Sequence, residues 1–259
     1  MKASFSEFSF GYALTDELVN SYRRLLYAAP RFPSLLEEGG SEGGYDVQLN
    51  AQGHFLFLQF KLSDYMMRRS AGQWHHYREE YYRFSVMPLR RSEQHNLLLA
   101  LEARYALVFC AAPAFYLVED LNEGFLGKDI ASRTTFVVPS IIGPLPDNGD
   151  HHVTFDLHGQ RLRLWSEPKV LEGHAFGPEF MDQVNARVRN REPQIIGNEA
   201  FISLSNDLKA ILAQQGELSP YAARQLETLP PVQRTVHISR TYFDSELLIV
   251  RTQHDSNNV

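Results

Sequence analysis

Several hallmarks of common protein classes are missing from this 259-residue sequence. Its single cysteine, Cys110, lies in an apolar run, so we expect a buried thiol and neither an internal disulfide nor a cysteine metal site. No apolar run approaches the length of about 20 residues that crosses a bilayer. The first residues lack the apolar core of a secretory signal. These absences lead us to expect a cytoplasmic protein that has no membrane partner.

Three sequence motifs of nucleotide-binding proteins and hydrolases are also missing. The chain has no G-x-x-x-x-G-K-[ST] phosphate loop, no G-x-G-x-x-G dinucleotide motif and no G-x-S-x-G nucleophile elbow. Two His-His pairs occur, at 75–76 and at 151–152. They do not predict a zinc site, because neighbouring residues of a strand point to opposite faces and no third ligand follows at zinc-site spacing.

Positive charge is scarce overall but concentrated in one part of the chain. A formal net charge of −6 and an isoelectric point of about 5.9 give no global case for nucleic-acid binding. Residues 61 to 104, however, hold eight Lys or Arg against five Asp or Glu, with aromatic residues between them. Such a segment can contact phosphates and stack on bases, or it can be a solvated, partly disordered insertion. The candidate nucleic-acid contacts are Arg68, Arg69, Trp74, Arg78, Arg90 and Arg91.

Hydrophobic periodicity predicts an α/β fold in the first half of the chain. A helix is expected at 15–30, capped by Thr15 or Asp16 and ended by Pro30. A second helix is expected at 91–104, with Ser92 as its cap. The expected strands are 45–50, 54–61, 81–88 and 105–115, with residues 51–53 as a turn between the first two.

The second half of the chain is less regular. We expect a hairpin about His158-Gly159 in which Val153 faces Leu164 and Phe155 faces Leu162. Further elements are expected as helices at 176–189, 199–215 and 219–227 and as a strand at 246–252. No clear linker separates two domains, and the weakest join lies at about 127–150.

Polar residues end an otherwise apolar strand, and this is the feature that suggests chemistry. The strand 54–61 is apolar on both faces until Gln59 and Lys61, which share one face. If the turn pairs Leu49 with His54, Gln59 becomes the diagonal neighbour of Asp46, roughly 7–8 Å away along the backbone. An acid, an amide and an ammonium would then meet at the edge of a sheet.

The spacing D-x12-Q-x-K, preceded by Glu37, Glu38 and Glu42, resembles the motif of the PD-(D/E)XK nuclease superfamily. The resemblance covers about residues 12 to 118. It implies a restriction-endonuclease-like mixed sheet flanked by helices, with a nuclease-like core at 1–127 that carries the basic, aromatic insertion at 62–91. Residues 128–259 would be an α+β extension packed on this core, with no function assigned.

The resemblance implies hydrolysis of phosphodiester bonds in nucleic acid, with DNA expected, and suggests a role in restriction or antiviral defence. The catalytic residues would be Asp46, Gln59, Lys61 and Glu38, and Asp46, Gln59 and Glu38 would bind Mg²⁺ or Mn²⁺. Lys61 would orient a water molecule and stabilise negative charge. Gln94 on the following helix could face the same site, and His95 beside it could donate to a phosphate. Gln59 departs from the commoner glutamate, and its neutral oxygen should hold metal more weakly.

Two other functions stay open at this stage. The first is a catalytically inactive binding or assembly module, in which the nuclease-like fold is a scaffold that docks a protein partner or a second copy of the chain. The second is an unrelated α/β enzyme, which would have a deep apolar pocket between the two halves and away from Asp46.

Overall fold

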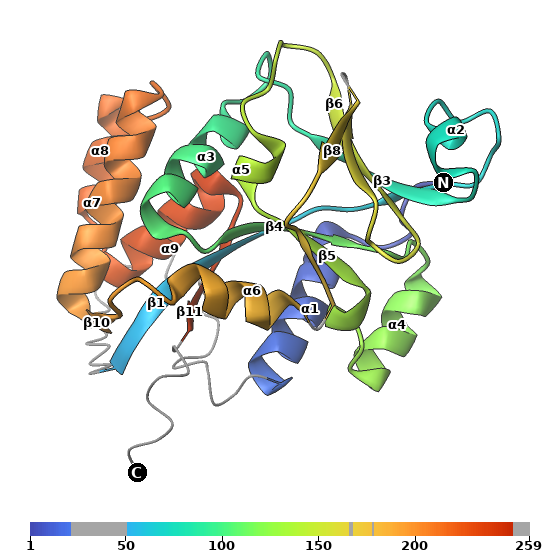
Figure 1. Ribbon diagram of the computed structural model, residues 1–259. Coiled ribbons are helices and arrows are strands. Elements are labelled where there is room, and N and C mark those ends of the chain that lie inside the picture. The colour runs from blue at the N-terminus through green and yellow to red at the C-terminus, as the bar shows by residue number, and fades with distance from the viewer. Residues whose placement is uncertain (22–50, 166–167, 178, 251–259) are drawn as a thin grey trace.

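The computed structural model describes residues 1–21, 51–165, 168–177 and 179–250. Its helices, labelled in Figure 1, are α1 (Glu7–Ser21), α2 (Trp74–Tyr77), α3 (Gln94–Tyr105), α4 (Val118–Gly127), η1 (Ala131–Arg133), α5 (Pro139–Ile142), α6 (Glu179–Val188), α7 (Asn198–Gln214), α8 (Pro220–Glu227) and α9 (Pro231–Phe243). Its strands are β1 (Ala51–Phe60), β2 (Asp64–Met66), β3 (Tyr81–Val86), β4 (Val108–Pro113), β5 (Thr134–Val137), β6 (His151–Asp156), β7 (Leu162–Trp165), β8 (Lys169–Leu171), β9 (Ala175–Phe176), β10 (Gln194–Ile196) and β11 (Glu246–Val250). The protein is therefore a mixed α/β fold, as its periodicity predicts.

The long strand β1 is the centre of the larger sheet. That sheet has the order β10-β1-β4-β5-β9, and β11 also pairs with β1. β1 runs parallel to β4 and antiparallel to β11, with Phe57 opposite Val108 on one side and opposite Leu247 on the other. The expected central strand is thus confirmed, and it is bounded by strands from both ends of the chain.

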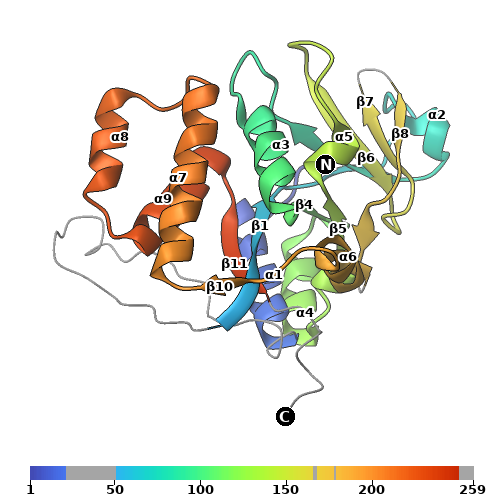
Figure 2. The ribbon, with the colours of Figure 1, turned by 60° about the vertical axis from the view of Figure 1, so that its left-hand side comes forward.

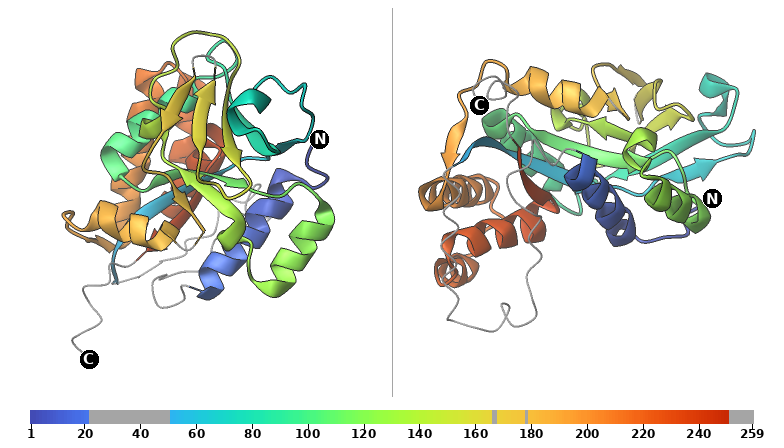
Figure 3. Two further views of the ribbon diagram at one scale, coloured as in Figure 1. Left: turned by 45° about the vertical axis from the view of Figure 1, so that its right-hand side comes forward. Right: turned by 90° about the horizontal axis from the view of Figure 1, so that it is seen from below.

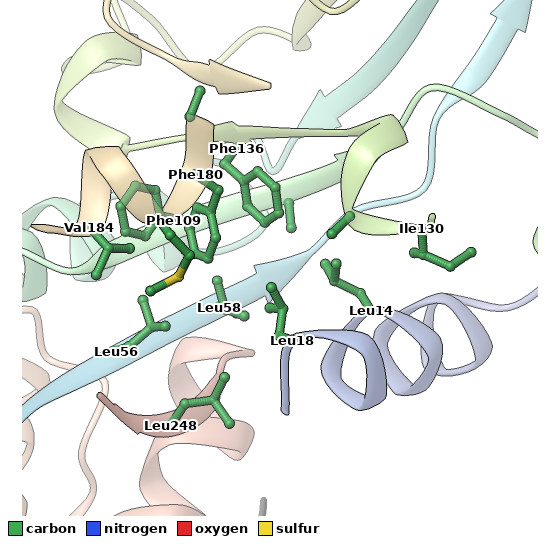
Figure 4. Close-up of a cluster of buried hydrophobic side chains, with 14 of the residues drawn as sticks. Leu14, Leu18, Leu56, Leu58, Phe109, Ile130, Phe136, Phe180, Val184 and Leu248 are labelled. Carbon is green, nitrogen blue, oxygen red and sulfur yellow. The ribbon is translucent and has the colours of Figure 1, made fainter. Parts of the chain in front are cut away.

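Helices cover both faces of the larger sheet, because the side chains of β1 alternate between two apolar layers. Leu56 and Leu58 pack in a cluster with residues of α1 and α6, and Figure 4 shows these side chains gathered around β1 and β11. Phe55 and Phe57 point to the opposite face, where they pack in a cluster with residues of α3, α7 and α9. The view from below in Figure 3 shows α7 to α9 gathered at one end of the molecule, with α4 toward the other end. Each phenylalanine buried here contributes about 2 kcal/mol to folding.

A second sheet, β2-β3-β6-β7-β8, packs against the end of the first. Its apolar face holds Phe84 and Val153, which share a cluster with Ala112 of β4 and Val137 of β5. The expected hairpin is confirmed in its register, because Val153 faces Leu164, and Gly159 supplies a positive φ of 64° at its turn. Figure 2 shows this sheet on the side of the molecule away from α7 and α8.

The basic, aromatic insertion expected at 62–91 is part of this second sheet. It contains β2, α2 and β3, and Tyr81 pairs with Asp156 of β6. The expected strand at 81–88 is confirmed as β3, which pairs with β2 and β6 and so belongs to the second sheet. The expected boundary at residue 127 does not separate the two sheets, because each sheet contains strands from both sides of that residue.

Several helices and strands begin or end at other residues than the hydrophobic periodicity predicts. Residues 51–53 form no turn, because they continue β1 and pair with β10. The first helix begins at Glu7, since the Ser6 hydroxyl accepts a hydrogen bond from the Ser9 amide and caps it nine residues before Thr15. α9 was not expected at all. The expected strand 45–50 lies outside the described residues. Within the described residues, each helix is too short or too polar to cross a lipid bilayer.

One glycine sets how closely α1 approaches β1. A Cβ added at Gly11 would lie 2.5 Å from a ring carbon of Phe60, which is far inside van der Waals contact. Phe60 also packs edge-on against Phe10 at 6.0 Å between ring centroids. Gly11 therefore lets the last residue of β1 lie directly under α1.

We expect Gly11→Ala to destabilise the fold by about 1–3 kcal/mol, because the new methyl group must displace the Phe60 ring. In an exposed helix the same change would stabilise by about 1 kcal/mol. Gly72→Ala is the matched control, since a Cβ there meets no atom within 4 Å. Urea denaturation measures both variants, and equal stabilities would contradict the proposed close packing.

Candidate functional site

The polar end of β1 carries Gln59 and Lys61 on one face of the sheet. Gln59 is only 2% exposed, and its Oε1 accepts a hydrogen bond from Cys110 Sγ at 3.3 Å. Its Nε2 is buried without a hydrogen-bond partner in the part of the chain that the structure describes. A cavity of about 10 Å³, the space of one water molecule, lies against Gln59, Lys61 and Gln94. The amide oxygen of Gln59 is thus held by Cys110, whereas its amide nitrogen can still donate a hydrogen bond.

Asp244 brings a carboxylate to Lys61 from the far end of the chain. It follows α9 and precedes β11, and its Oδ2 lies 3.9 Å from Lys61 Nζ. The same oxygen accepts a hydrogen bond from Gln94 Nε2 at 3.2 Å. Since Lys61 is only 14% exposed and Asp244 is 53% exposed, the pair joins a half-buried ammonium to a carboxylate that solvent reaches.

The backbone of Asp244 is strained. Its φ of 50° and ψ of 44° place it in the left-handed region at the C-cap of α9, where glycine is preferred. Aspartate enters this region more readily than most residues do. Arg78 and Lys128 adopt the same conformation at the C-caps of α2 and α4, so this conformation by itself marks a helix end.

Glu7 adds a second carboxylate from the first turn of α1. Burial raises its pKa above the ordinary value, the nearby Lys61 ammonium opposes this rise, and the Asp244 carboxylate adds to it. Glu7 and Asp244 line one groove of about 510 Å³. The remaining lining residues are Phe8, Gly11, Tyr12, Thr15, Phe60, Arg240, Ser245 and Glu246.

These groups form a cluster that we call the β1-end site: Glu7, Gln59, Lys61, Gln94 and Asp244. Lys61 is its only cation, and its charge acts on Glu7 and on the Cys110 thiol, whose pKa burial raises to about 11. The cluster can bind an oxyanion or a cation between its ammonium and its two carboxylates. In the described ranges no three His, Cys, Asp or Glu side chains come together as a metal group.

The residues present nevertheless fit Mg²⁺. This ion is usually held by one or two carboxylates, keeps several waters and takes further oxygens from phosphates. Glu7 and Asp244 supply two carboxylates that line one groove. Gln59 could offer its Oε1 only if its amide turned away from Cys110.

The structure brings some predicted site residues together and leaves others untested. Gln59, Lys61 and Gln94 line one cavity. Asp46 and Glu38 lie outside the described residues, as do Glu37 and Glu42, so their roles stay predictions.

His95 does not fit the expected role of phosphate donor. It is 3% exposed, and its Nε2–H donates to the Gly143 carbonyl at 2.7 Å. Burial lowers its pKa, which favours the neutral ring. A neutral ring with Nε2 protonated has no second N–H, so His95 links α3 to the loop after α5 instead.

The predicted nucleic-acid contacts lie on the second sheet and its loops. Arg68, Arg69, Arg78 and Arg91 are exposed, and Trp74 is half-buried at the start of α2. Arg90 donates to Asp150 Oδ1 at 2.6 Å, so part of its charge is already compensated. Figure 1 shows α2 at the outer edge of this sheet, away from α7 to α9.

The sequence analysis did not identify Glu7 and Asp244 as site residues, although local sequence features lie next to both. Ser6 before Glu7 is a common helix cap, and it would have moved the helix start forward. Asp244 lies between an aromatic residue and the strand that pairs with β1, in a stretch where α9 was not expected. Long-range pairing of β11 with β1 could not be read from either segment alone.

No family model, no curated protein and no solved structure matches this chain. The functional argument therefore rests on the geometry of the β1-end site.

We expect Asp244→Gly to raise the free energy of unfolding by up to about 1 kcal/mol, because glycine relieves the left-handed backbone. Asp244→Asn should be nearly neutral, since asparagine tolerates the same conformation. Lys128→Gly is the matched control, at a C-cap with φ 56° on α4. Chemical denaturation compares the three. A clear loss of stability in Asp244→Gly would mean that its contacts with Gln94 and Lys61 outweigh the strain.

Proposed function

We propose that this protein is a Mg²⁺-dependent nuclease that hydrolyses phosphodiester bonds in nucleic acid, with DNA as the expected substrate and the cytoplasm as its location. The proposal depends on one observation: Lys61 Nζ, at the end of the central strand, lies 3.9 Å from the carboxylate of Asp244, which lines one groove with Glu7. It agrees with the PD-(D/E)XK-like motif, in which Gln59 and Lys61 end a strand that is followed by a helix and a parallel strand. A role in restriction or antiviral defence stays part of this proposal.

Two described carboxylates would hold the metal ion. Asp244 is exposed enough to meet a hydrated cation, and Glu7 lines the same groove. Asp46 and Glu38 are further candidate ligands from the motif. When bound, Mg²⁺ would polarise the scissile phosphate and acidify a water molecule.

Lys61 would act on the substrate directly. An ammonium that is largely shielded from water stabilises negative charge more strongly than one in bulk solvent. The reaction places extra negative charge on the phosphate oxygens in the transition state, and Lys61 lies 3.9 Å from Asp244, one of the two candidate metal ligands. Gln94 holds Asp244 in place by its hydrogen bond and so acts as a positioning residue.

The second sheet would bind the nucleic-acid backbone. Its exposed arginines Arg68, Arg69 and Arg78 lie on or beside the β2–β3 connection. Each phosphate contact releases counterions, so affinity should fall as salt rises. Because the whole chain is acidic, this local surface would supply most of the attraction.

A second candidate function is a catalytically inactive binding or assembly module. The position of Gln59 favours it, because a neutral amide replaces the common glutamate and its oxygen already accepts a bond from Cys110. In this case the fold would dock a protein partner or a second copy of the chain. A cleavage assay separates the two functions.

We expect the purified chain to cleave plasmid or single-stranded DNA in Mg²⁺ or Mn²⁺ and to lose this activity in EDTA. Lys61→Ala should reduce the cleavage rate by about 100-fold or more, because one charge-stabilising donor is lost. Asp46→Ala and Asp244→Asn test the carboxylates separately. Lys128→Gly, an exposed lysine on α4, should cleave normally.

Two results would contradict the proposal. Absence of metal-dependent cleavage by the wild type would favour the inactive module. Undiminished cleavage by Lys61→Ala and Asp244→Asn would remove the β1-end site from the reaction, whatever the fold.

We expect metal affinity to fall as pH drops through the raised pKa of Glu7, because protons then compete with the ion for the carboxylate. The fall should begin at a higher pH than for an ordinary glutamate. Glu7→Gln should weaken Mn²⁺ binding by about 10-fold or more and flatten this pH dependence. It should also stabilise the fold at neutral pH, since a raised folded-state pKa means that stability is lost as pH rises.

Calorimetric titration of Mn²⁺ at several pH values measures this effect. Glu217→Gln, which changes an exposed glutamate after α7, is the control. A pH profile that is the same in Glu7→Gln and wild type would exclude Glu7 as a ligand.

A further inference from the structure

We propose that the groove beside the β1-end site binds an unpaired nucleobase, so that the preferred substrate has a single-stranded or flipped-out nucleotide next to the scissile phosphate. This inference rests on the proposed nuclease function and deepens it, because it names the class of substrate. Its starting point is the outer face of α1, where two aromatic rings stand in solvent.

The two rings are Phe8, which is 71% exposed, and Tyr12, which is 50% exposed. They lie four residues apart on α1, so they occupy one face of the helix on successive turns. Both line the groove of about 510 Å³ that also holds Glu7 and Asp244. Phe8 follows Glu7, a candidate metal ligand, so the aromatic face of α1 begins next to the β1-end site.

The rings are not needed for the core of the fold. The apolar side of α1 packs through Phe10, Leu14 and Leu18, which are all buried. Tyr12 contacts Phe125 of α4 at 6.1 Å between ring centroids, which supports the Tyr12 ring from behind. Figure 3 shows α1 and α4 side by side on one face of the sheet. The exposure of both rings therefore leaves flat apolar surfaces free for a ligand.

The charges of the groove favour a base over an apolar protein surface. Glu7, Asp244 and Glu246 place three carboxylates along its walls. The core of a protein interface is usually depleted of charged residues, because burying them costs desolvation. A base is neutral, stacks on rings with its flat face and keeps its polar edges toward hydrogen-bonding groups.

The phosphate would lie beside the groove, at Lys61. Arg240, which lines the groove, is held by Glu246 through two hydrogen bonds, with Nε at 2.9 Å from Oε2, so its charge is largely compensated. Lys61 is not among the residues that line the groove, but its Nζ lies 3.9 Å from Oδ2 of Asp244, which does line it. The phosphate would sit at Lys61 and the metal ion, and the neighbouring base would lie over Phe8 and Tyr12.

Duplex DNA fits this arrangement poorly. Its bases are stacked and paired, and extruding one costs a few kcal/mol. An unpaired nucleotide avoids that cost and gains the stacking on the rings. The groove thus predicts a preference for single strands, flaps, bulges or damaged sites over intact duplex.

The test uses a single-stranded oligodeoxynucleotide that carries 2-aminopurine, a fluorescent base that is quenched by stacking. The protein is the wild-type full chain with Ca²⁺ in place of Mg²⁺, and a gel verifies that the oligonucleotide stays intact, so that binding is measured without cleavage. We expect quenching on binding, and weaker binding of the same oligonucleotide in a duplex. Phe8→Ala and Tyr12→Ala should each weaken single-strand binding by about 5- to 100-fold.

Matched variants separate stacking from simple apolar contact. Phe8→Leu keeps an apolar side chain but loses the flat ring, and it should bind as weakly as Phe8→Ala. Phe8→Trp should restore binding. Tyr221→Ala removes an equally exposed ring on α8, 68% exposed, and should bind like the parent chain.

Three outcomes would overturn the inference: no change in 2-aminopurine fluorescence, equal binding of single strand and duplex, or normal binding by Phe8→Leu. Self-association of the wild type that Phe8→Ala and Leu126→Ala both abolish would also overturn it, because the face would then be a contact between copies. Leu126 is 81% exposed at the end of α4.

The two proposals fail in different ways. If the chain cleaves DNA but the ring variants bind single strands normally, the nuclease stands and the base site does not. If the chain never cleaves DNA but quenching depends on Phe8 and Tyr12, the nuclease fails and the groove is a binding site for unpaired bases.

Discussion

The pairing of β1 with strands on both of its sides is the interaction on which the rest of the structure depends. Phe57 faces Val108 of β4 in one direction and Leu247 of β11 in the other, and the strand is apolar on both faces. Such a strand is fully buried until its last residues leave the two apolar layers. Gln59 is still buried and Lys61 is 14% exposed, so the polar groups gather where the strand begins to leave the core.

The β1-end site is assembled from four remote segments. Glu7 comes from α1, Gln59 and Lys61 from β1, Gln94 from α3, and Asp244 from the junction of α9 and β11. Close packing fixes their distances, because Gly11 lets α1 touch Phe60 and β11 holds Asp244 beside the end of β1. The site has one ammonium near two carboxylates and an aromatic surface at its margin. The proposed binding of a metal ion, a phosphate and a base depends on this combination.

Local sequence patterns predicted individual helices and strands better than they predicted which strands pair with one another. The alternation at 152–165 was sufficient for the hairpin, since the register of Val153 with Leu164 depends only on nearby residues. The apolar run before Gln59 correctly indicated a central strand. The turn at 51–53 was wrong because the small residues there suggested a break, whereas pairing with β10, more than 140 residues later, keeps the strand extended. The same limit hid Asp244, whose position depends on β11 reaching β1. Asp46 and Glu38 stay predictions from the motif.

The place of β11 in the larger sheet has a consequence for synthesis on the ribosome. The central strand is complete once residue 60 has emerged, yet one of its two edges stays open until residues 246–250 have also left the exit tunnel. Closing such a long loop is slow, and an open apolar edge invites aggregation. Until those residues have emerged, a nascent chain would expose this edge of β1, and the β1-end site could not form, because Asp244 would be missing.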